Sequence, residues 1–360
     1  MKKIISSLSL CLSLIGLQAQ NGQIVGGSAV TNGDYQFMAT LLSPNSSGST
    51  DLSNDFFCGG SLIAPGWVLT AAHCVTDFST SPAKAVLPSE VEVGFDIYAL
   101  ENPNGTWIHR TVDMVIVHPD FLDGSDENAD VALIKLSSPV MGIKPIALPA
   151  GENDTLHEMI GTMLRNIGFG SNFDPNIVPN FHQSDTLLFV DLGVISVDSA
   201  KSLHSDYADL NGRALPTLGP DSVQDKSPCF GDSGGPLFND HGIDPVQVGV
   251  VSWGSFCGDA DYAAVFARVS KQITWIKSHI VDLSTDNPQK VELAFVGNQK
   301  LILMEAGDES ELRVFDGLGR IVYFETLANK EKDLSFLRSG YYTLSIEKNG
   351  LQNRIKYVAP

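Results

Sequence analysis

The chain is organised around the stretch Pro228-Cys229-Phe230-Gly231-Asp232-Ser233-Gly234-Gly235-Pro236. Glycines on both sides of the serine allow backbone conformations that side chains forbid, so several N–H groups can point into one small space. A hydroxyl beside converging N–H donors suits acyl transfer, which needs a nucleophile and donors for the oxyanion that attack creates. A simple turn that binds an anion is the alternative, and two other segments decide between them.

These segments supply a histidine and an aspartate. They are Leu69-Thr70-Ala71-Ala72-His73-Cys74 and Asn128-Ala129-Asp130-Val131-Ala132-Leu133-Ile134-Lys135-Leu136. The reactive residues thus follow one another in the order His, Asp, Ser, which differs from the order in subtilisins and α/β-hydrolases. With all three motifs intact, residues 24–283 resemble the chymotrypsin-fold (S1 family) serine peptidases.

The resemblance implies a role for each motif. Ser233 is expected to attack the peptide carbonyl, His73 to accept its proton and later return it, and Asp130 to orient the imidazole. The N–H groups of Gly231 and Ser233 are expected to form the oxyanion hole. The substrate pocket is expected to be lined by Ser227, Ser252, Trp253, Gly254 and Ala264.

The residue at the base of this pocket predicts the substrate preference. Ser227 stands where trypsin-like members keep an aspartate, so a substrate Lys or Arg would be buried without a partner, which is unfavourable. We expect an apolar pocket, narrowed by Ala263-Ala264, that prefers Leu, Met, Phe or Tyr before the cut, as in chymotrypsin or elastase. Asp259 leaves an alternative open, because a carboxylate reaching into the pocket would favour basic residues.

The amino-terminal residues predict export. A short basic segment precedes an apolar run over residues 8–17, which is typical of a signal peptide, here residues 1–19. The apolar run is too short to span a bilayer. Residues 20–23 are predicted to be a short propeptide.

The resemblance implies that the mature protein begins directly after the propeptide. Ile24-Val25-Gly26-Gly27 matches the mature amino terminus of the family, whose α-ammonium would pair with Asp232 and so convert a zymogen into an enzyme. Gln23, rather than Arg or Lys, precedes the cut, so trypsin is not expected to activate this chain efficiently.

Four cysteines remain after the predicted signal peptide, namely Cys58, Cys74, Cys229 and Cys257, and four allow three pairings. The resemblance implies Cys58–Cys74 and Cys229–Cys257. A zinc site is not expected, because no C-x₂-C pair is present. The acidic run at 120–130 lacks the spacing of a calcium loop and is predicted to be a solvated loop. No metal or cofactor is expected.

Short apolar runs between turn residues predict an all-β fold. They occur at 37–42, 60–63, 67–70, 91–95, 112–117 and 131–136, and again at 187–190, 193–197, 236–238, 246–253 and 264–269. The two halves resemble the two antiparallel six-stranded β-barrels of the family, with the motifs at their junction. Gly168-Phe169-Gly170 resembles the family's turn at the start of the second barrel, and residues 270–281 are expected to form its closing carboxy-terminal helix.

The composition changes beyond a polar linker at 284–290. Residues 24–284 hold 31 Asp and Glu against 11 Lys and Arg, whereas residues 285–360 hold 11 against 10. The acidity of the first part argues against nucleic acid as a partner. Residues 291–360 resemble the Ig-like β-sandwich that sorts proteins through the type IX secretion system, on the landmarks Gly319-Arg320, Asp333-Leu334-Ser335 and Gly340-Tyr341-Tyr342. An adhesive or carbohydrate-binding sandwich is the alternative.

These features predict a secreted, monomeric serine endopeptidase that acts on proteins or peptides. It would cross the periplasm and engage the outer-membrane secretion machinery through its tail, to be released or kept at the cell surface. The alternative is a catalytically silent peptidase homologue that binds a partner at the surface. Such homologues usually lack one of the three catalytic residues, and all three are present here.

Overall fold

The structure is a computed structural model that describes residues 26–101, 103, 107–171, 183–220, 226–242, 244–259, 261–280, 294–297, 300–303, 310–316, 320–327, 331–348 and 351–359. The predicted signal peptide, the propeptide, Ile24 and the linker lie outside these ranges. Within the ranges, every helix is too short or too polar to cross a membrane.

The first half forms a closed antiparallel barrel of six strands, as predicted. Its strand order is β2-β3-β4-β9-β8-β7, and β7 pairs back to β2. The strands are β2 (Met38–Leu42), β3 (Phe56–Ala64), β4 (Trp67–Thr70), β7 (Glu92–Phe95), β8 (Ile108–Val117) and β9 (Ala132–Leu136). A small hairpin of β5 (Thr76–Asp77) and β6 (Lys84–Ala85) extends from the loop after β4.

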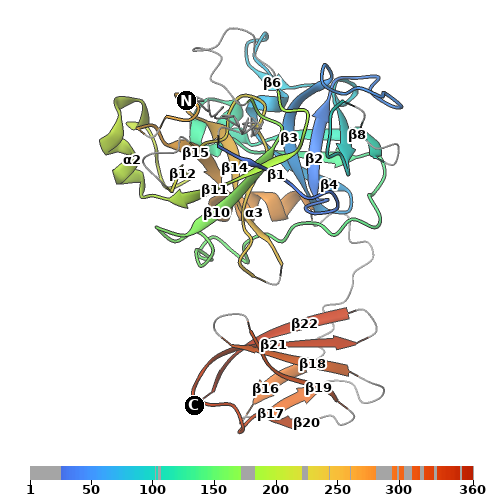
Figure 1. Cartoon of the computed structure of the whole chain (residues 1–360), viewed down its shortest axis with the longest axis vertical. Coiled ribbons are helices and arrows are strands. Elements are labelled where there is room, and N and C mark those ends of the chain that lie inside the picture. Colours follow the sequence, from blue (N-terminus) through green and yellow to red (C-terminus); the bar gives the residue numbers. More distant parts are fainter. Residues whose placement is uncertain are drawn as a thin grey trace, which may run out of the picture.

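The second half forms a second ring of six strands, which lies beside the first in Figure 1. Its order is β11-β10-β13-β14-β15-β12, and pairing of Gly193 with Leu218 closes the ring between β11 and β12. The strands are β10 (Met163–Gly168), β11 (Leu188–Val194), β12 (Ala214–Leu218), β13 (Pro236–Asn239), β14 (Val246–Trp253) and β15 (Ala264–Arg268), with β1 (Ser28–Ala29) added beside β11.

Side-chain alternation explains why these segments close into barrels. In β11 the residues Leu188, Val190, Leu192 and Val194 are buried while those between them are partly exposed, so one face of the strand fills the barrel. Burying an aliphatic side chain of this size stabilises the fold by about 1.5–3 kcal/mol. The core of the first barrel continues into the junction, where it takes in side chains from the second barrel.

The closing helix α3 (Val269–Ile280) is confirmed and joins the two halves. Ile273 and Ile276 are fully buried, and Ile276 and Trp275 pack on the hydrophobic core of the first barrel. The ring of Trp275 lies 4.8 Å from that of His118. The short helices are α1 (Pro119–Leu122), α2 (Val197–Leu203), η1 (His73–Val75), η2 (Pro88–Glu90), η3 (Glu127–Ala129) and η4 (Ser205–Tyr207).

The carboxy-terminal residues form two further antiparallel sheets, drawn as a separate unit in Figure 1. One contains β16 (Ala294–Gly297), β17 (Lys300–Leu303) and β20 (Glu331–Asp333). The other contains β19 (Ile321–Leu327), β18 (Ser310–Asp316), β21 (Gly340–Lys348) and β22 (Leu351–Ala359). Leu301 of the first sheet shares a small core with Leu312 and Leu344 of the second. The two sheets thus face one another, while an Ig-like identity stays a prediction.

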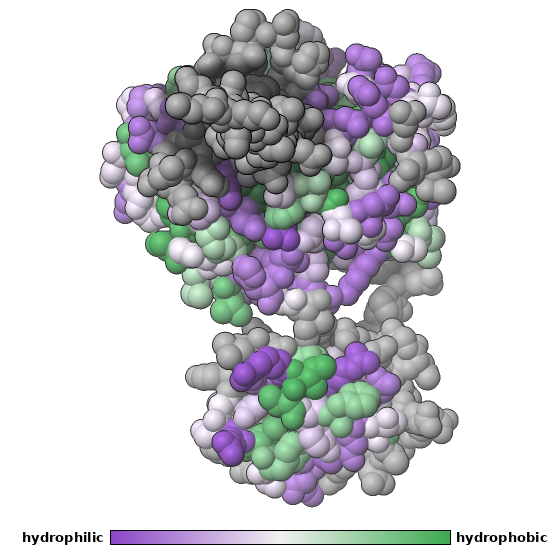
Figure 2. Space-filling model, viewed as in Figure 1, coloured by the Kyte–Doolittle hydropathy of each residue, from purple (hydrophilic) through white to green (hydrophobic). Residues whose placement is uncertain are grey.

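One edge of this carboxy-terminal unit carries exposed hydrophobic side chains. β19 pairs only with β18 and lies at the edge of its sheet. Figure 2 shows a hydrophobic patch on this unit, in the region where Figure 1 places β19. Among the described residues of this unit, the exposed large hydrophobic side chains are Ile321, Val322, Phe324 and Phe336.

Candidate active site

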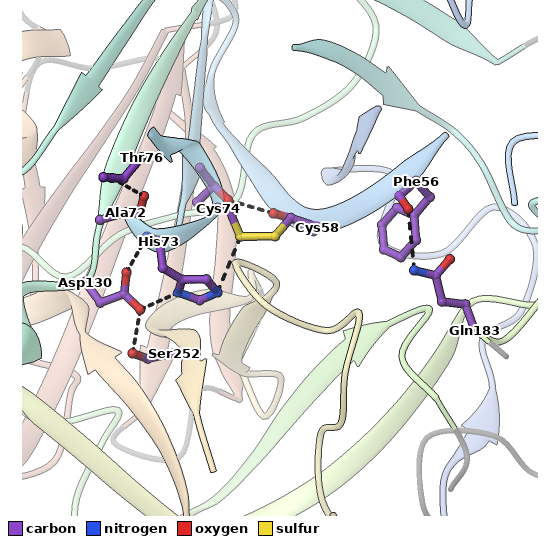
Figure 3. Close-up of a disulfide and its surroundings, with 11 residues drawn as sticks. Phe56, Cys58, Ala72, His73, Cys74, Thr76, Asp130, Gln183 and Ser252 are labelled. Carbon is purple, nitrogen blue, oxygen red and sulfur yellow. Dashed lines mark hydrogen bonds and ion pairs between the residues drawn. A yellow bond between two sulfur atoms is a disulfide. The ribbon is translucent and has the colours of Figure 1, made fainter. Parts of the chain in front are cut away.

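A buried carboxylate joins the two barrels at their junction. Asp130 directly follows η3, and its side chain is 3% exposed. Oδ1 accepts a hydrogen bond from the backbone N–H of His73 at 2.9 Å, and Oδ2 lies 2.7 Å from Nδ1 of the same residue. Oδ2 also accepts a hydrogen bond from the Ser252 hydroxyl at 2.6 Å (Figure 3). The first barrel supplies His73 and Asp130, and the second supplies Ser252.

This arrangement holds the imidazole of His73 in one orientation. Because a carboxylate only accepts, Nδ1 carries the proton in this contact and Nε2 is the ring nitrogen that can act as a base. Nε2 lies on the other side of the ring, 3.7 Å from Sγ of Cys74. Burial lowers the pKa of His73, but the hydrogen bond and the charge of Asp130 outweigh it, so the pKa is raised above its ordinary value.

The glycine-rich loop around Ser233 is held by backbone hydrogen bonds from both barrels. Gly59 of β3 donates to the Ser233 carbonyl at 2.7 Å, and Gly234 donates to the Val251 carbonyl of β14 at 2.9 Å. A Cβ on Gly234 would overlap the Gly59 carbonyl, and φ is +78° there, so glycine is required. Among the described residues, the N–H groups of Gly231 and Ser233 have no hydrogen-bond partner.

Asp232 is completely buried, and its carboxylate lies against Gly168 and Gly170 of the second barrel. Its carboxylate accepts hydrogen bonds from the N–H groups of Gly170 and Cys229, each at 2.8 Å. A side chain at Gly168 or Gly170 would overlap this carboxylate, which explains the Gly-Phe-Gly turn. Burial raises the pKa of Asp232 to about 7, although the two backbone hydrogen bonds oppose the shift. Its predicted partner, Ile24, lies outside the described residues.

A pocket opens beside Ser233, with a cavity volume of about 190 Å³. Ser233 and all five residues predicted for the substrate pocket line it, namely Ser227, Ser252, Trp253, Gly254 and Ala264. The Ser227 hydroxyl accepts a hydrogen bond from the N–H of Gly258 at 2.7 Å. Every side chain found in the lining is uncharged.

Two aromatic residues at this pocket were missed by the sequence analysis. Phe230 and Phe256 are 50% and 41% exposed, and both contribute to the lining. Each directly precedes a residue that the sequence does mark, Gly231 in one case and Cys257 in the other. Their position beside the motifs was therefore a usable signal. Asp259, in contrast, is exposed, does not line the pocket, and accepts a hydrogen bond from the N–H of Asp261 at 2.9 Å.

The disulfides agree with the predicted pairing. Cys58 is bonded to Cys74 beside His73 (Figure 3), and Cys229 is bonded to Cys257, both of which line the pocket. Disulfides are typical of an oxidising compartment, as expected for an extracellular protein.

The acidic run before Asp130 differs from the solvated loop that was predicted. Arg213 of the second barrel forms ion pairs with Asp120 and Asp126, and residues 119–122 and 127–129 are helical. Asp123 and Glu127 are exposed, as predicted, but the contact with Arg213 was not predicted, because Arg213 lies 87 positions from Asp126 and only the folded chain brings them together.

Two closed barrels with a His–Asp pair at their junction are typical of the chymotrypsin-like peptidases. Residues 24–276 match the family model described as Trypsin. A phenoloxidase-activating factor 3 from Holotrichia diomphalia is 30% identical over 281 residues, covering 74% of each chain. A trypsin from Squalus acanthias is 31% identical over 232 residues, covering 63% of this chain and 87% of that protein. A tryptase from Mus musculus is 30% identical over 299 residues, covering 78% and 98%.

The chain therefore belongs to the trypsin family of serine peptidases. The resemblance to this family is confirmed over residues 24–276, while the predicted domain end at 283 stays a prediction. The resemblance of residues 291–360 to a sorting domain stays a prediction.

The buried carboxylate of Asp232 predicts a pH-dependent stability for a chain that begins at Gln20. Its pKa is raised in the folded state to about 7, so the folded state keeps a proton that the unfolded state loses near pH 4. The stabilising contribution is full below about pH 4 and is lost as the pH rises through about 7. Thermal unfolding should therefore show a melting temperature that falls between pH 5 and pH 8.

Two comparisons isolate this carboxylate from other titrating groups. Asp232→Asn should reduce the fall between pH 5 and pH 8, because the amide does not titrate. A chain that begins at Ile24 should also show a smaller fall, because its α-ammonium can pair with the carboxylate. An identical pH dependence in all three proteins would refute the assignment.

Proposed function

We propose that this protein is a secreted serine endopeptidase that hydrolyses peptide bonds through Ser233, His73 and Asp130. The observation that carries the proposal is the His73–Asp130–Ser252 contact, because Ser252 lines the same pocket as Ser233. Membership of a serine peptidase family agrees with it. The disulfides and the predicted signal peptide support secretion.

In the proposed reaction, the Ser233 hydroxyl attacks the carbonyl carbon of the substrate while Nε2 of His73 takes its proton. The N–H groups of Gly231 and Ser233 stabilise the oxyanion, and each such donor is worth about 2.7–4 kcal/mol in related chemistry. The C–N bond then breaks and His73 gives its proton to the leaving amine. Water, activated by His73, hydrolyses the acyl-enzyme and restores Ser233. Asp130 stabilises the imidazolium formed in both steps.

The pocket is proposed to accept uncharged, apolar side chains. Ser227 replaces a carboxylate at its base, and its hydroxyl is already bonded to the Gly258 N–H. Gly254 and Ala264 both line the pocket, and a Cβ on Gly254 would stand 3.9 Å from Cα of Ala264, so a larger side chain at Gly254 would take up space in the pocket. Phe230 and Phe256 add exposed aromatic surface that a bound side chain can cover. Together these features favour Leu, Met, Phe or Tyr before the cut.

Activation is proposed to depend on a cut after Gln23. The new α-ammonium of Ile24 would pair with the buried carboxylate of Asp232 and supply the cation that it lacks among the described residues. Asp232 and Ser233 are adjacent, so this pairing would order the loop that carries the nucleophile and the oxyanion donors. Comparing the pH dependence of the melting temperature between chains that begin at Gln20 and at Ile24 tests this pairing directly.

Residues 291–360 are proposed to direct export through the outer-membrane secretion machinery. The composition changes sharply at the preceding linker, and the unit presents an exposed hydrophobic edge at β19. An exposed sheet edge with hydrophobic side chains is suited to binding a partner.

Ser233→Ala should abolish peptide hydrolysis in a chain that begins at Ile24, because a methyl group replaces the nucleophilic hydroxyl with little change in volume. A phosphonate that labels active serine peptidases should react with the parent and spare the variant. A variant that retained a tenth of the parent activity would disprove the triad assignment. A folded parent that neither reacts nor cleaves would favour the catalytically silent homologue.

Matched peptides that differ only at the residue before the cut should separate the pocket interpretations. We expect kcat/KM for Phe or Leu to exceed that for Arg or Lys by about 100-fold, because the cation would be buried without a partner. Gly254→Val should lower kcat/KM for Phe by about 10-fold and affect Ala less, because it takes up space in the pocket. As a control, Asp259→Asn should leave the preference unchanged. A preference for Arg or Lys would overturn the assignment.

Deletion of residues 291–360 should stop export in the source organism. The truncated peptidase is expected to accumulate in the periplasm in a form that can still be activated, because both barrels lie before residue 281. Immunoblots of periplasm and medium, with the Ser233→Ala full-length chain as an exported control, would measure this. Normal release of the truncated chain would count decisively against the proposal.

A further inference from the structure

The turn that precedes Asp130 is built around a second aspartate. Asp126 caps η3, where its Oδ1 accepts hydrogen bonds from the N–H and the side-chain amide of Asn128, each at 3.0 Å. The Asp126 carbonyl accepts a hydrogen bond from the N–H of Ala129 at 3.0 Å. Asp130 follows at once, so the Asp126 side chain helps to set the path of the backbone that carries it.

The second barrel bonds to this same carboxylate. The Asn211 side-chain amide donates to Oδ1 of Asp126 at 2.9 Å, and Nη1 of Arg213 lies 3.3 Å from Oδ2. The same Nη1 donates to Asp120 at 2.5 Å, and the side chain of Asn128 donates to the Asp209 carbonyl at 3.2 Å. We call the Asp126, Asn211 and Arg213 contacts the inter-barrel brace.

The second barrel holds its end of the inter-barrel brace through a backbone hydrogen bond. The Arg213 carbonyl accepts a hydrogen bond from the N–H of Arg268, the last residue of β15, at 2.7 Å. At the other end, the Asp126 side chain is only 18% exposed. Burial raises its pKa, but hydrogen bonds from Asn128 and Asn211 and the charge of Arg213 outweigh this and lower the pKa below its ordinary value. Asp126 therefore stays ionised at neutral pH.

An exposed ion pair of this kind contributes little to global stability. Arg213 is one-third exposed and Asp120 slightly more so. The location of the contacts is more informative than their strength. They tie the second barrel, which carries Ser233 and Ser252, to the backbone four residues before Asp130 in the first barrel.

We propose that Arg213 and Asn211 are positioning residues for Asp130, acting through the carboxylate of Asp126. The inference rests on the proposed function, in which His73 and Asp130 of one barrel must meet Ser233 of the other. Catalysis depends steeply on such alignment, so a small displacement of the η3 turn would weaken the His73–Asp130 contact and slow the chemical step. Substrate binding, which takes place in the pocket of the second barrel, would be largely unaffected.

The test compares Arg213→Met, Asp126→Asn and the double variant in the full chain activated to begin at Ile24. Each single variant should lower kcat about 10-fold while KM stays within about two-fold. The double variant should be no slower than the slower single variant, because both act through one contact. Arg213→Lys, which keeps a cation, should restore part of kcat.

Lys144→Met is the matched control. Lys144 forms an exposed ion pair with Asp244 that also joins the two barrels, but it lies away from the η3 turn. Its removal should leave kcat and KM unchanged. Equal kcat in Arg213→Met and Lys144→Met would overturn the proposal, as would a fall in kcat that merely follows a fall in melting temperature.

A second readout does not depend on turnover. The low-field proton resonance of the His73 Nδ1–H reports its hydrogen bond to Asp130, and it should shift or broaden in Arg213→Met and Asp126→Asn but not in Lys144→Met. If the parent cleaves no peptide, the proposed function fails while this resonance still tests the brace. An unchanged resonance in both brace variants would refute the positioning role.

Discussion

The site depends on the buried carboxylate of Asp130. A carboxylate out of contact with water is tolerated only when donors surround it, and here the donors come from both barrels. His73 supplies two from the loop after β4, and Ser252 supplies one from β14. These contacts hold the imidazole in one tautomer and also fix the relative placement of the barrels where they meet.

A second buried carboxylate, that of Asp232, directly precedes the proposed nucleophile Ser233 in the chain. Among the described residues, Asp232 accepts hydrogen bonds from backbone groups only, in space left by Gly168 and Gly170, and burial there raises its pKa. Asp130 is surrounded by donors, whereas Asp232 lacks a cation among the described residues. Asp232 and Ser233 are adjacent in the chain. The charge state of the buried Asp232 carboxylate is therefore linked to the backbone geometry of Ser233 at the pocket.

Charge at the surface has a different role. The barrels carry a large excess of acidic residues, yet the described residues that line the pocket are all uncharged. Some of this acidity is structural, because Asp120 and Asp126 meet Arg213 across the junction. Such contacts add little to stability, and the role proposed for them is to align Asp130, which follows Asp126 by four residues.

The sequence by itself determined an all-β fold, whereas the two barrels, the closing helix and the disulfide pairing were predicted through the family resemblance. Those features follow from local alternation, turn residues and motifs that are read within a few positions of one another, such as the alternating residues of β11. Only the tertiary structure decided which distant residues meet. It placed Phe230 and Phe256 at the pocket, kept Asp259 away from it, and brought Arg213 to an acidic run that had been predicted to be solvated. The physical reason is that such contacts depend on how two closed barrels pack, and no short-range pattern in the chain encodes that packing.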